Sequence, residues 1–418
     1  MKAFTSSQFN HVICLFILLL IIFLSACGDN NPLSEGPGVQ ERGDIIEANA
    51  VMTYSPEAVT GVLEMINIPF PYEQKYPVKY VQIVYLTIDN TGKLSRASGG
   101  LFVPEAAESL PLLGLQHGTE VKRDNVASTS PLSSVEAATG LLTGSMGYVT
   151  AVPDYTGFGV STSMHPYIHA ASLSTEVIDY LRAVKSYCTD NNVSLNDQLF
   201  LAGYSEGGYV TLAAQKEIEQ NYSAEFQITA SAPMAGPYDV AGTIMDGFRK
   251  LTYPEPAYVA YLLTAYDNIY GWNRLDDIFS APYSSQVTGL FDGSKTWGEV
   301  INQLPDTVDD LLRQEFIDAY LNGSEAEIQA AFEDNTLLDW SPASPICFIH
   351  GTADNIVPFK NAQTAYDNLS ALSSADMKLV PVEGGTHETS GVPAILLMLE
   401  YFEGYRNGYL LAGINSIF

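Results

Sequence analysis

Residues 203–207 read Gly-Tyr-Ser-Glu-Gly and place Ser205 two positions from a glycine on either side. An apolar run ends just before them at Ala202, and residues 210–216 are typical of a helix. A strand, a tight G-x-S-x-G turn and a helix hold a serine at the tip of a strained turn with its hydroxyl exposed. A Cβ at either glycine would collide with a neighbouring strand or helix. We predict that Ser205 is a nucleophile; the alternative is a glycine-rich turn with a surface serine.

A serine nucleophile needs a base and an acid, and these occur here in the order Ser205, Asp354, His387. Asp354 follows an apolar, strand-like run, and His387 follows Gly-Gly-Thr in a loop. We expect the Asp354 carboxylate to accept the Nδ1–H of His387 and to fix the tautomer of the ring. Asp239 is the competing acid, Asp354 could instead cap a helix, and His387 could be an exposed loop residue. We expect His350 to hydrogen-bond locally.

The oxyanion formed by such a serine needs backbone N–H groups that point to where negative charge develops. One donor is the amide after the nucleophile, which belongs to Glu206. The second comes from the loop after an earlier strand, where Thr119 is our first choice and Gly118 our second. An ordinary strand-to-loop turn is the alternative for this loop. We expect the Glu206 carboxylate to have a structural role in the first turn of its helix, where the dipole favours negative charge.

The chain of 418 residues has a formal net charge of −29, which disfavours nucleic acids and anionic membrane surfaces as partners. The cysteines and histidines have no metal-binding spacing, so we expect no metal site and no cofactor. Cys188 and Cys347 are expected to be buried free thiols, although one disulfide between them is possible. There is no internal repeat.

The amino terminus is expected to lie outside the fold. Residues 1–26 combine Lys2 with an apolar run that is short for a membrane span, as in an export signal. Residues 24–27, Leu-Ser-Ala-Cys, resemble the lipobox of bacterial lipoproteins, which implies that Cys27 is acylated and becomes the mature amino terminus. Residues 27–47 are expected to form a flexible tether. The chain would then be exported and anchored to a membrane, inner or outer, by its lipid; an ordinary secretory signal is the alternative.

Apolar strand-like runs alternate with helical patterns along the remaining chain, which indicates a mostly parallel sheet that begins with an antiparallel hairpin. In such sheets ligands bind beyond the carboxyl ends of the strands. The Ser205 turn, the 117–119 loop, Asp354 and His387 all lie at that end. Helices are expected at residues 133–145 and 174–188. The expected strands lie at residues 78–86, 93–103, 110–116, 147–152, 199–202, 226–232, 345–349 and 377–382.

The Ser205 turn, the 117–119 loop, Asp354 and His387 together resemble the α/β-hydrolase superfamily over nearly all of the mature chain. Residues 152–159 (Val-Pro-Asp-Tyr-Thr-Gly-Phe-Gly) and 165–167 (His-Pro-Tyr), with a long insertion before the acid-bearing strand, resemble its secretory lipase and esterase group. The resemblance implies an α/β-hydrolase core at residues 48–238 and 342–418, and a helical cap at 239–341. It also implies ester hydrolysis, but not a particular substrate, because such caps differ widely.

The insertion is rich in tyrosine, and Tyr258, Tyr261 and Tyr266 share one face of an expected helix. Most of this face is expected to pack the cap onto the core, and a minority to line an apolar cleft over Ser205. These three tyrosines are therefore candidates for the cleft.

These observations predict a serine ester hydrolase of the esterase or lipase type, which forms an acyl-enzyme and acts on small-molecule, lipid or polysaccharide esters. A serine peptidase of the same fold is one alternative, although only a short segment precedes the first expected core strand, leaving little room for a large gating domain. A non-catalytic surface-binding protein is the other. The oligomeric state is not predicted.

Overall fold

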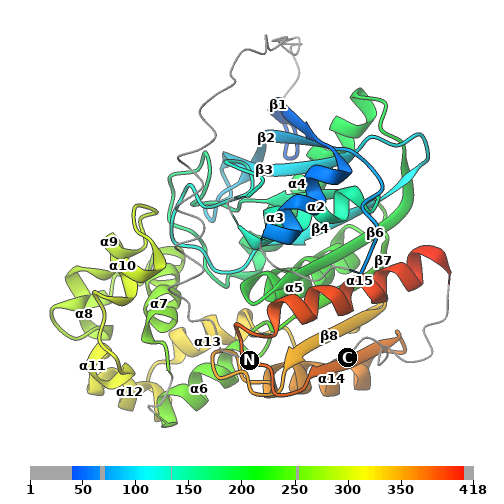
Figure 1. The fold of residues 1–418 in the computed structure, drawn as a ribbon. Helices are drawn as coiled ribbons and strands as arrows, with labels where there is room; N and C mark the ends of the chain where they lie inside the picture. Colours follow the sequence, from blue (N-terminus) through cyan, green and yellow to red (C-terminus); the bar gives the residue numbers. More distant parts are fainter. Residues whose placement is uncertain (1–39, 66–70, 133, 251–253, 409–418) are drawn as a thin grey trace. The chain divides into compact units, whose positions relative to one another are not determined.

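The computed structural model of the chain describes residues 40–65, 71–132, 134–250 and 254–408. These residues contain a nine-stranded sheet with the strand order β1-β2-β3-β5-β4-β6-β7-β8-β9 (Figure 1). Pairs β1–β2, β2–β3 and β3–β5 are antiparallel and the remaining pairs are parallel. The strands are β1 (Ile45–Tyr54), β2 (Val78–Ile88), β3 (Leu94–Pro104), β4 (Leu110–Gln116), β5 (Val149–Pro153), β6 (Leu195–Tyr204), β7 (Ile228–Met234), β8 (Ile346–Gly351) and β9 (Met377–Val382).

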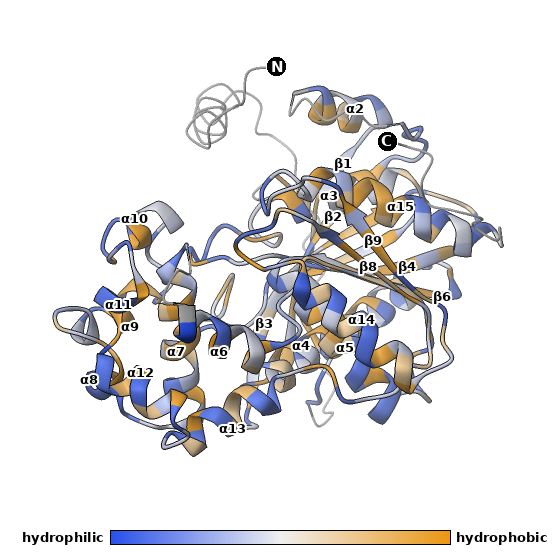
Figure 2. Ribbon diagram, turned by 90° about the horizontal axis from the view of Figure 1, so that it is seen from below, coloured by the Kyte–Doolittle hydropathy of each residue, from blue (hydrophilic) through white to orange (hydrophobic). Residues whose placement is uncertain are grey.

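Helices cover both faces of the sheet, and the side chains of β6 alternate between them. Leu199 and Leu201 pack in the same cluster as α4 and α5, whereas Phe200 and Ala202 pack with α3 and α15. The buried stretches of the central strands are therefore mostly apolar, as expected of strands covered on both faces (Figure 2). The helices outside the insertion are α2 (Pro56–Met65), α3 (Val135–Ser145), α4 (Ala170–Asp190), α5 (Glu206–Asn221), α14 (Lys360–Leu372) and α15 (Gly391–Asn407).

The chain between β7 and β8 is helical and lies as a group beside the sheet (Figure 1). Its buried side chains are continuous with the cluster on the α4 and α5 face. The elements are α6 (Val240–Lys250), α7 (Pro256–Tyr270), α8 (Leu275–Ile278), η1 (Tyr283–Ser285), α9 (Val287–Leu290), α10 (Trp297–Ile301), α11 (Val308–Leu311), α12 (Gln314–Leu321) and α13 (Ala326–Asp334). A helical insertion thus occupies the position where the sequence predicts a cap.

The expected strands and helices are found within a few residues of their predicted bounds, but β1 and α2 were not predicted. The tether predicted at residues 27–47 is wrong at its carboxyl end, because Ile45–Glu47 already belong to β1. β1 is an edge strand with mostly exposed or half-buried side chains, so it lacks the apolar alternation that marks a strand. The export signal and Cys27 lie outside the described residues.

The start of β1 is fixed to α4 by a buried carboxylate. Asp179 has no exposed side-chain surface and accepts hydrogen bonds from Arg42 Nε at 3.1 and 3.0 Å, from Arg182 at 2.8 Å and from Thr87 at 2.8 Å. Several donors compensate the lost hydration of this carboxylate, so removing its charge leaves them poorly paired.

Cys188 and Cys347 are both free and buried, which confirms the preferred prediction, and burial raises the pKa of each thiol to about 12. Among the described helices, none combines the length and hydropathy that a bilayer crossing needs.

We predict that Asp179→Asn lowers the free energy of unfolding by about 3 kcal/mol, because it leaves Arg42 without its anionic partner. Chemical denaturation measures this loss. The matched control is Glu225→Gln, which removes the partly exposed partner of Arg182 and should cost less than about 1 kcal/mol. Equal costs for the two substitutions would contradict the anchoring role of Asp179.

Candidate active site

Ser205 lies between the end of β6 and the first residue of α5, at φ 59° and ψ −122°, a strained conformation for a residue with a side chain. Its N–H donates to the Met234 carbonyl at 2.9 Å. A Cβ on Gly203 would lie 2.4 Å from the Gly207 carbonyl oxygen, and one on Gly207 would lie 2.2 Å from the Gln116 carbonyl oxygen. The two glycines therefore allow the close backbone approach that makes the turn, as the sequence predicted.

His387 lies in the loop after β9 and contacts both predicted partners. Its Nε2 is 2.9 Å from Ser205 Oγ and its Nδ1 is 2.7 Å from Asp354 Oδ2. Tyr204, next to the nucleophile, donates its hydroxyl proton to the His387 carbonyl at 2.7 Å and so holds the loop against the turn. Sequence reasoning missed this contact. The structure thus brings together three residues that the sequence separates by up to 182 positions.

The Asp354 carboxylate is buried and remains easily ionised. Burial opposes its ionisation, but hydrogen bonds from His350 and His387 outweigh that cost and lower the pKa of Asp354 to about 2. Its Oδ1 also accepts the backbone N–H groups of Ile356 at 3.0 Å and Val357 at 2.9 Å. An anion held this firmly can orient the His387 ring and stabilise its protonated form.

The competing acid, Asp239, is not the carboxylate that contacts the His387 ring. Its carboxylate accepts the Gly242 N–H at 2.9 Å at the start of α6, while Asp354 contacts His387. His350 hydrogen-bonds to the Val357 carbonyl at 2.7 Å, the local role expected of it.

The loop after β4 borders the nucleophile, since a Cβ on Gly118 would lie 3.9 Å from Ser205 Cβ. The Gly118 N–H donates to Glu136 Oε1 at 3.0 Å, so our second choice for the oxyanion donor is already engaged. Within the described part of the chain, the Thr119 N–H has no acceptor. Glu206 begins α5, so its N–H has no carbonyl partner inside the helix. Thr119 and Glu206 therefore remain as the two candidate donors.

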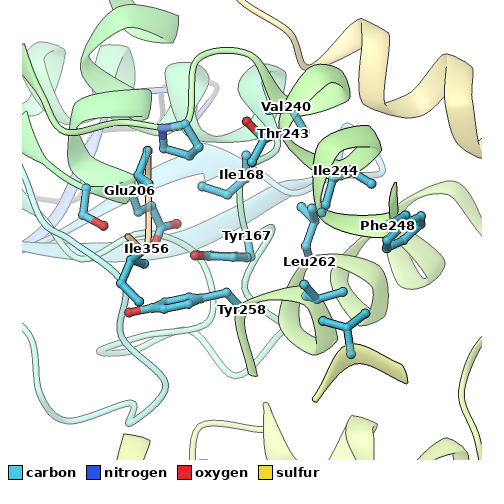
Figure 3. A pocket seen from close by; sticks show the side chains of 16 residues that line it. Tyr167, Ile168, Glu206, Val240, Thr243, Ile244, Phe248, Tyr258, Leu262 and Ile356 are labelled. Atoms are coloured by element: carbon cyan, nitrogen blue, oxygen red, sulfur yellow. The ribbon is translucent and has the colours of Figure 1, made fainter. Parts of the chain in front are cut away.

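A mostly apolar pocket of about 70 Å³ opens beside Ser205 (Figure 3). Glu206 and Ile356 lie at one end of the pocket, and Phe248 lies at the other. Half of the lining residues belong to α6 and α7, so the insertion shapes much of the space next to the nucleophile. The lining residues are Tyr167, Ile168, Ser205, Glu206, Pro237, Val240, Thr243, Ile244, Gly247, Phe248, Tyr258, Val259, Leu262, Val308, Ile356 and Val357.

Of the three tyrosines predicted to line a cleft, only Tyr258 lines this pocket. Tyr261 is buried and stacks between the rings of Tyr167 and Phe291, with centroid distances of 4.4 and 4.3 Å. Tyr266 is buried and donates its hydroxyl proton to the Ile168 carbonyl at 2.8 Å. The placement of these last two in the cleft was wrong, because aromatic stacking and a buried hydrogen bond use their surfaces inside the fold.

Sequence reasoning overlooked the α6 wall, although its signal was present. Val240, Ile244 and Phe248 recur every four residues, which puts them on one face of a helix. Within the described residues, no three His, Cys, Asp or Glu side chains gather in a way that could hold a metal ion.

No protein-family model and no curated protein sequence matches this chain. Solved structures do match. The esterase LipA of Xanthomonas oryzae, which degrades rice cell walls, is 28% identical, with 89% of this chain and 99% of LipA covered and a TM-score of 0.76. A Legionella pneumophila protein assigned as a hydrolase is 24% identical, with 88% and 99% covered and a TM-score of 0.81. Candida antarctica lipase A is 16% identical, with 90% and 84% covered and a TM-score of 0.68.

These similarities confirm the α/β-hydrolase fold predicted from the sequence. LipA, at 28% identity, is an esterase, which supports ester hydrolysis at the level of the fold, whereas the other two structures support the fold alone.

The lowered pKa of Asp354 predicts a defined pH dependence of stability. The folded-state pKa of about 2 lies below the ordinary value of 3.8, so ionised Asp354 stabilises the fold above about pH 4 and this contribution is lost as the pH falls toward 2. We expect Asp354→Asn to lower the unfolding free energy by about 2 kcal/mol at pH 5 and by much less at pH 2.5. Chemical denaturation at both pH values measures the difference.

The control for this prediction is Asp367→Asn, on the exposed side of α14, which should change stability little at either pH. A cost for Asp354→Asn that is the same at both pH values would contradict the predicted ionisation of Asp354.

Proposed function

We propose that this protein is a serine hydrolase of carboxylic esters that works through an acyl-enzyme. The observation that carries the proposal is the His387 ring, which lies in hydrogen-bond contact with Ser205 on one side and with Asp354 on the other. This arrangement, rather than the fold alone, supports the assignment of a nucleophile and its base.

In the proposed reaction, Ser205 Oγ attacks the ester carbonyl carbon while its proton passes to His387 Nε2. The oxyanion accepts hydrogen bonds from the Glu206 and Thr119 N–H groups. The tetrahedral intermediate collapses, the C–O bond to the alcohol breaks, and His387 returns the proton to the departing oxygen. His387 then deprotonates a water that attacks the acyl-enzyme, which releases the acid and restores Ser205. Asp354 holds the Nδ1–H of His387 throughout and stabilises the imidazolium.

The pocket supports an apolar group on the substrate. Its walls are aliphatic and aromatic side chains such as Val240, Leu262 and Tyr258, and it begins at Ser205. An ester with an apolar acyl or aromatic group next to the scissile carbonyl would fill this space and exclude water. We place the boundaries of the cap that forms this wall at residues 239–341.

We further propose that the protein is exported and anchored to a membrane through a lipid on Cys27. The lipobox-like residues 24–27 support this, and so does the strongly acidic composition, which suits a soluble body outside the cell.

A chromogenic ester series with acyl groups of increasing length, and matched anilides, tests the proposed activity. We expect ester turnover by the wild type and a fall of at least about a thousandfold in Ser205→Ala and His387→Gln, because each removes part of the nucleophile and base pair. Ser161→Ala is the matched control; it changes a buried serine outside the triad and should keep wild-type turnover.

Anilide turnover that equals or exceeds ester turnover would favour a peptidase instead. Wild-type ester turnover by Ser205→Ala would contradict the proposal. A folded wild-type protein that hydrolyses no ester of the series would favour a binding protein.

A further inference from the structure

Glu206, the residue after the nucleophile, has a buried carboxylate close to where the oxyanion is proposed to form. The Glu206 side chain has no exposed surface, and it is attached to the residue whose N–H is proposed to hold the oxyanion. A carboxylate in a poorly solvated site repels negative charge that develops nearby. An uncompensated Glu206 would therefore raise the barrier that its own backbone N–H lowers.

His165 is placed to cancel this charge. Its Nδ1 is 2.9 Å from the Thr156 carbonyl oxygen, and its Nε2 is 2.7 Å from Glu206 Oε1. A carbonyl oxygen only accepts hydrogen bonds, so Nδ1 carries a proton. The contact between Nε2 and Oε1 needs a proton of its own, because two lone pairs at 2.7 Å would repel each other. The pair therefore holds both protons, and with a carboxylate at Glu206 the ring is an imidazolium.

The surroundings of the pair supply little other positive charge. Burial opposes protonation of His165, but the attraction of Glu206 outweighs it and raises the pKa of the ring. Burial also raises the pKa of Glu176 to about 7 and that of Glu120 to about 8. The charged or titratable groups that face the pair, or the rings packed on it, are Glu120, Glu136, Glu176, His117, Tyr155, Tyr167, Tyr209, Tyr258 and Tyr261.

Aromatic packing fixes the ring in place. The His165 ring lies 5.8 Å from the Tyr155 ring and 4.8 Å from the Phe158 ring, and its side chain is almost fully buried. His117 stacks on Tyr155 at 4.1 Å. A buried ring packed against four aromatic rings, those of Tyr155, Phe158, Tyr167 and Tyr261, cannot easily leave Glu206 when the substrate binds.

We propose that His165 is a positioning residue that holds a proton against the Glu206 carboxylate, so that the carboxylate neither opposes the oxyanion nor turns toward the nucleophile. This inference rests on the proposed ester hydrolysis and adds to it an electrostatic requirement beyond the triad. His165 touches neither the substrate nor the reacting atoms in this scheme; it acts through Glu206.

A double-mutant cycle tests the proposal by comparing the effect of His165→Gln in two backgrounds. With Glu206 present, the substitution leaves a buried carboxylate without its counter-charge, and we expect kcat for ester hydrolysis to fall about tenfold with KM little changed. In the Glu206→Gln background there is no charge to cancel, so His165→Gln should lower kcat less than about twofold. Similar losses in both backgrounds, or a loss carried by KM, would overturn the proposal.

His169→Gln is the matched control. His169 lies in the same segment and contacts the Ser172 hydroxyl at 2.8 Å instead of a carboxylate, so its replacement should leave kcat within about twofold of the wild type. A tenfold fall in this control would show that the segment tolerates no glutamine, and the charge argument would then lose its support.

The protonation of His165 can be measured without catalysis. Nitrogen-15 NMR of the imidazole should show both ring nitrogens of His165 protonated at pH 7 in the full-length wild type and in Ser205→Ala. A neutral ring would overturn the proposal even if the kinetic cycle could not be completed. Because this measurement does not use turnover, a failure of the ester-hydrolase assignment and a failure of the His165 inference are distinguishable.

Discussion

The contact between the His387 ring and its two partners is the interaction on which the site depends. Each partner is held by a different part of the sheet: Ser205 by the turn after β6, Asp354 by the loop after β8, and His387 by the loop after β9. These strands are parallel neighbours or near neighbours, so their carboxyl ends meet at one edge. The buried, hydrogen-bonded Asp354 then fixes the ring, and Tyr204 fixes the loop that carries it.

The site contains buried carboxylates, and each of them needs partners that replace its lost hydration. Asp354 is compensated by histidines and backbone N–H groups, and Asp179, farther away, by arginines. Among the described residues, His165 is the one hydrogen-bond partner of Glu206 Oε1, and Glu206 Oε2 is buried without a partner. The same need to satisfy a buried charge thus secures the edge strand β1 and defines the electrostatics next to the nucleophile.

The features that the sequence predicted correctly depend on local pattern and on the order of residues along the chain. The Ser205 turn has a fixed spacing of glycines, the buried stretches of the core strands are mostly apolar, and His387 is the only histidine after Asp354. The sequence did not predict what depends on which side chains meet in space. Tyr261 and Tyr258 look equivalent on one helix, yet only packing decides that Tyr258 lines the pocket and Tyr261 stacks inside the fold. Likewise, no spacing rule joins His165 to Glu206, and β1 has too few buried side chains to show a pattern.

Covalent labelling with a fluorophosphonate, located by mass spectrometry of the digested protein, tests the central claim most directly. The reagent reacts with a serine whose proton a neighbouring base can remove. The account predicts one adduct, on the peptide that contains Ser205, formed quickly in the wild type and about a thousandfold more slowly in His387→Gln. An unlabelled Ser205 in the folded protein, or labelling that does not depend on His387, would contradict it.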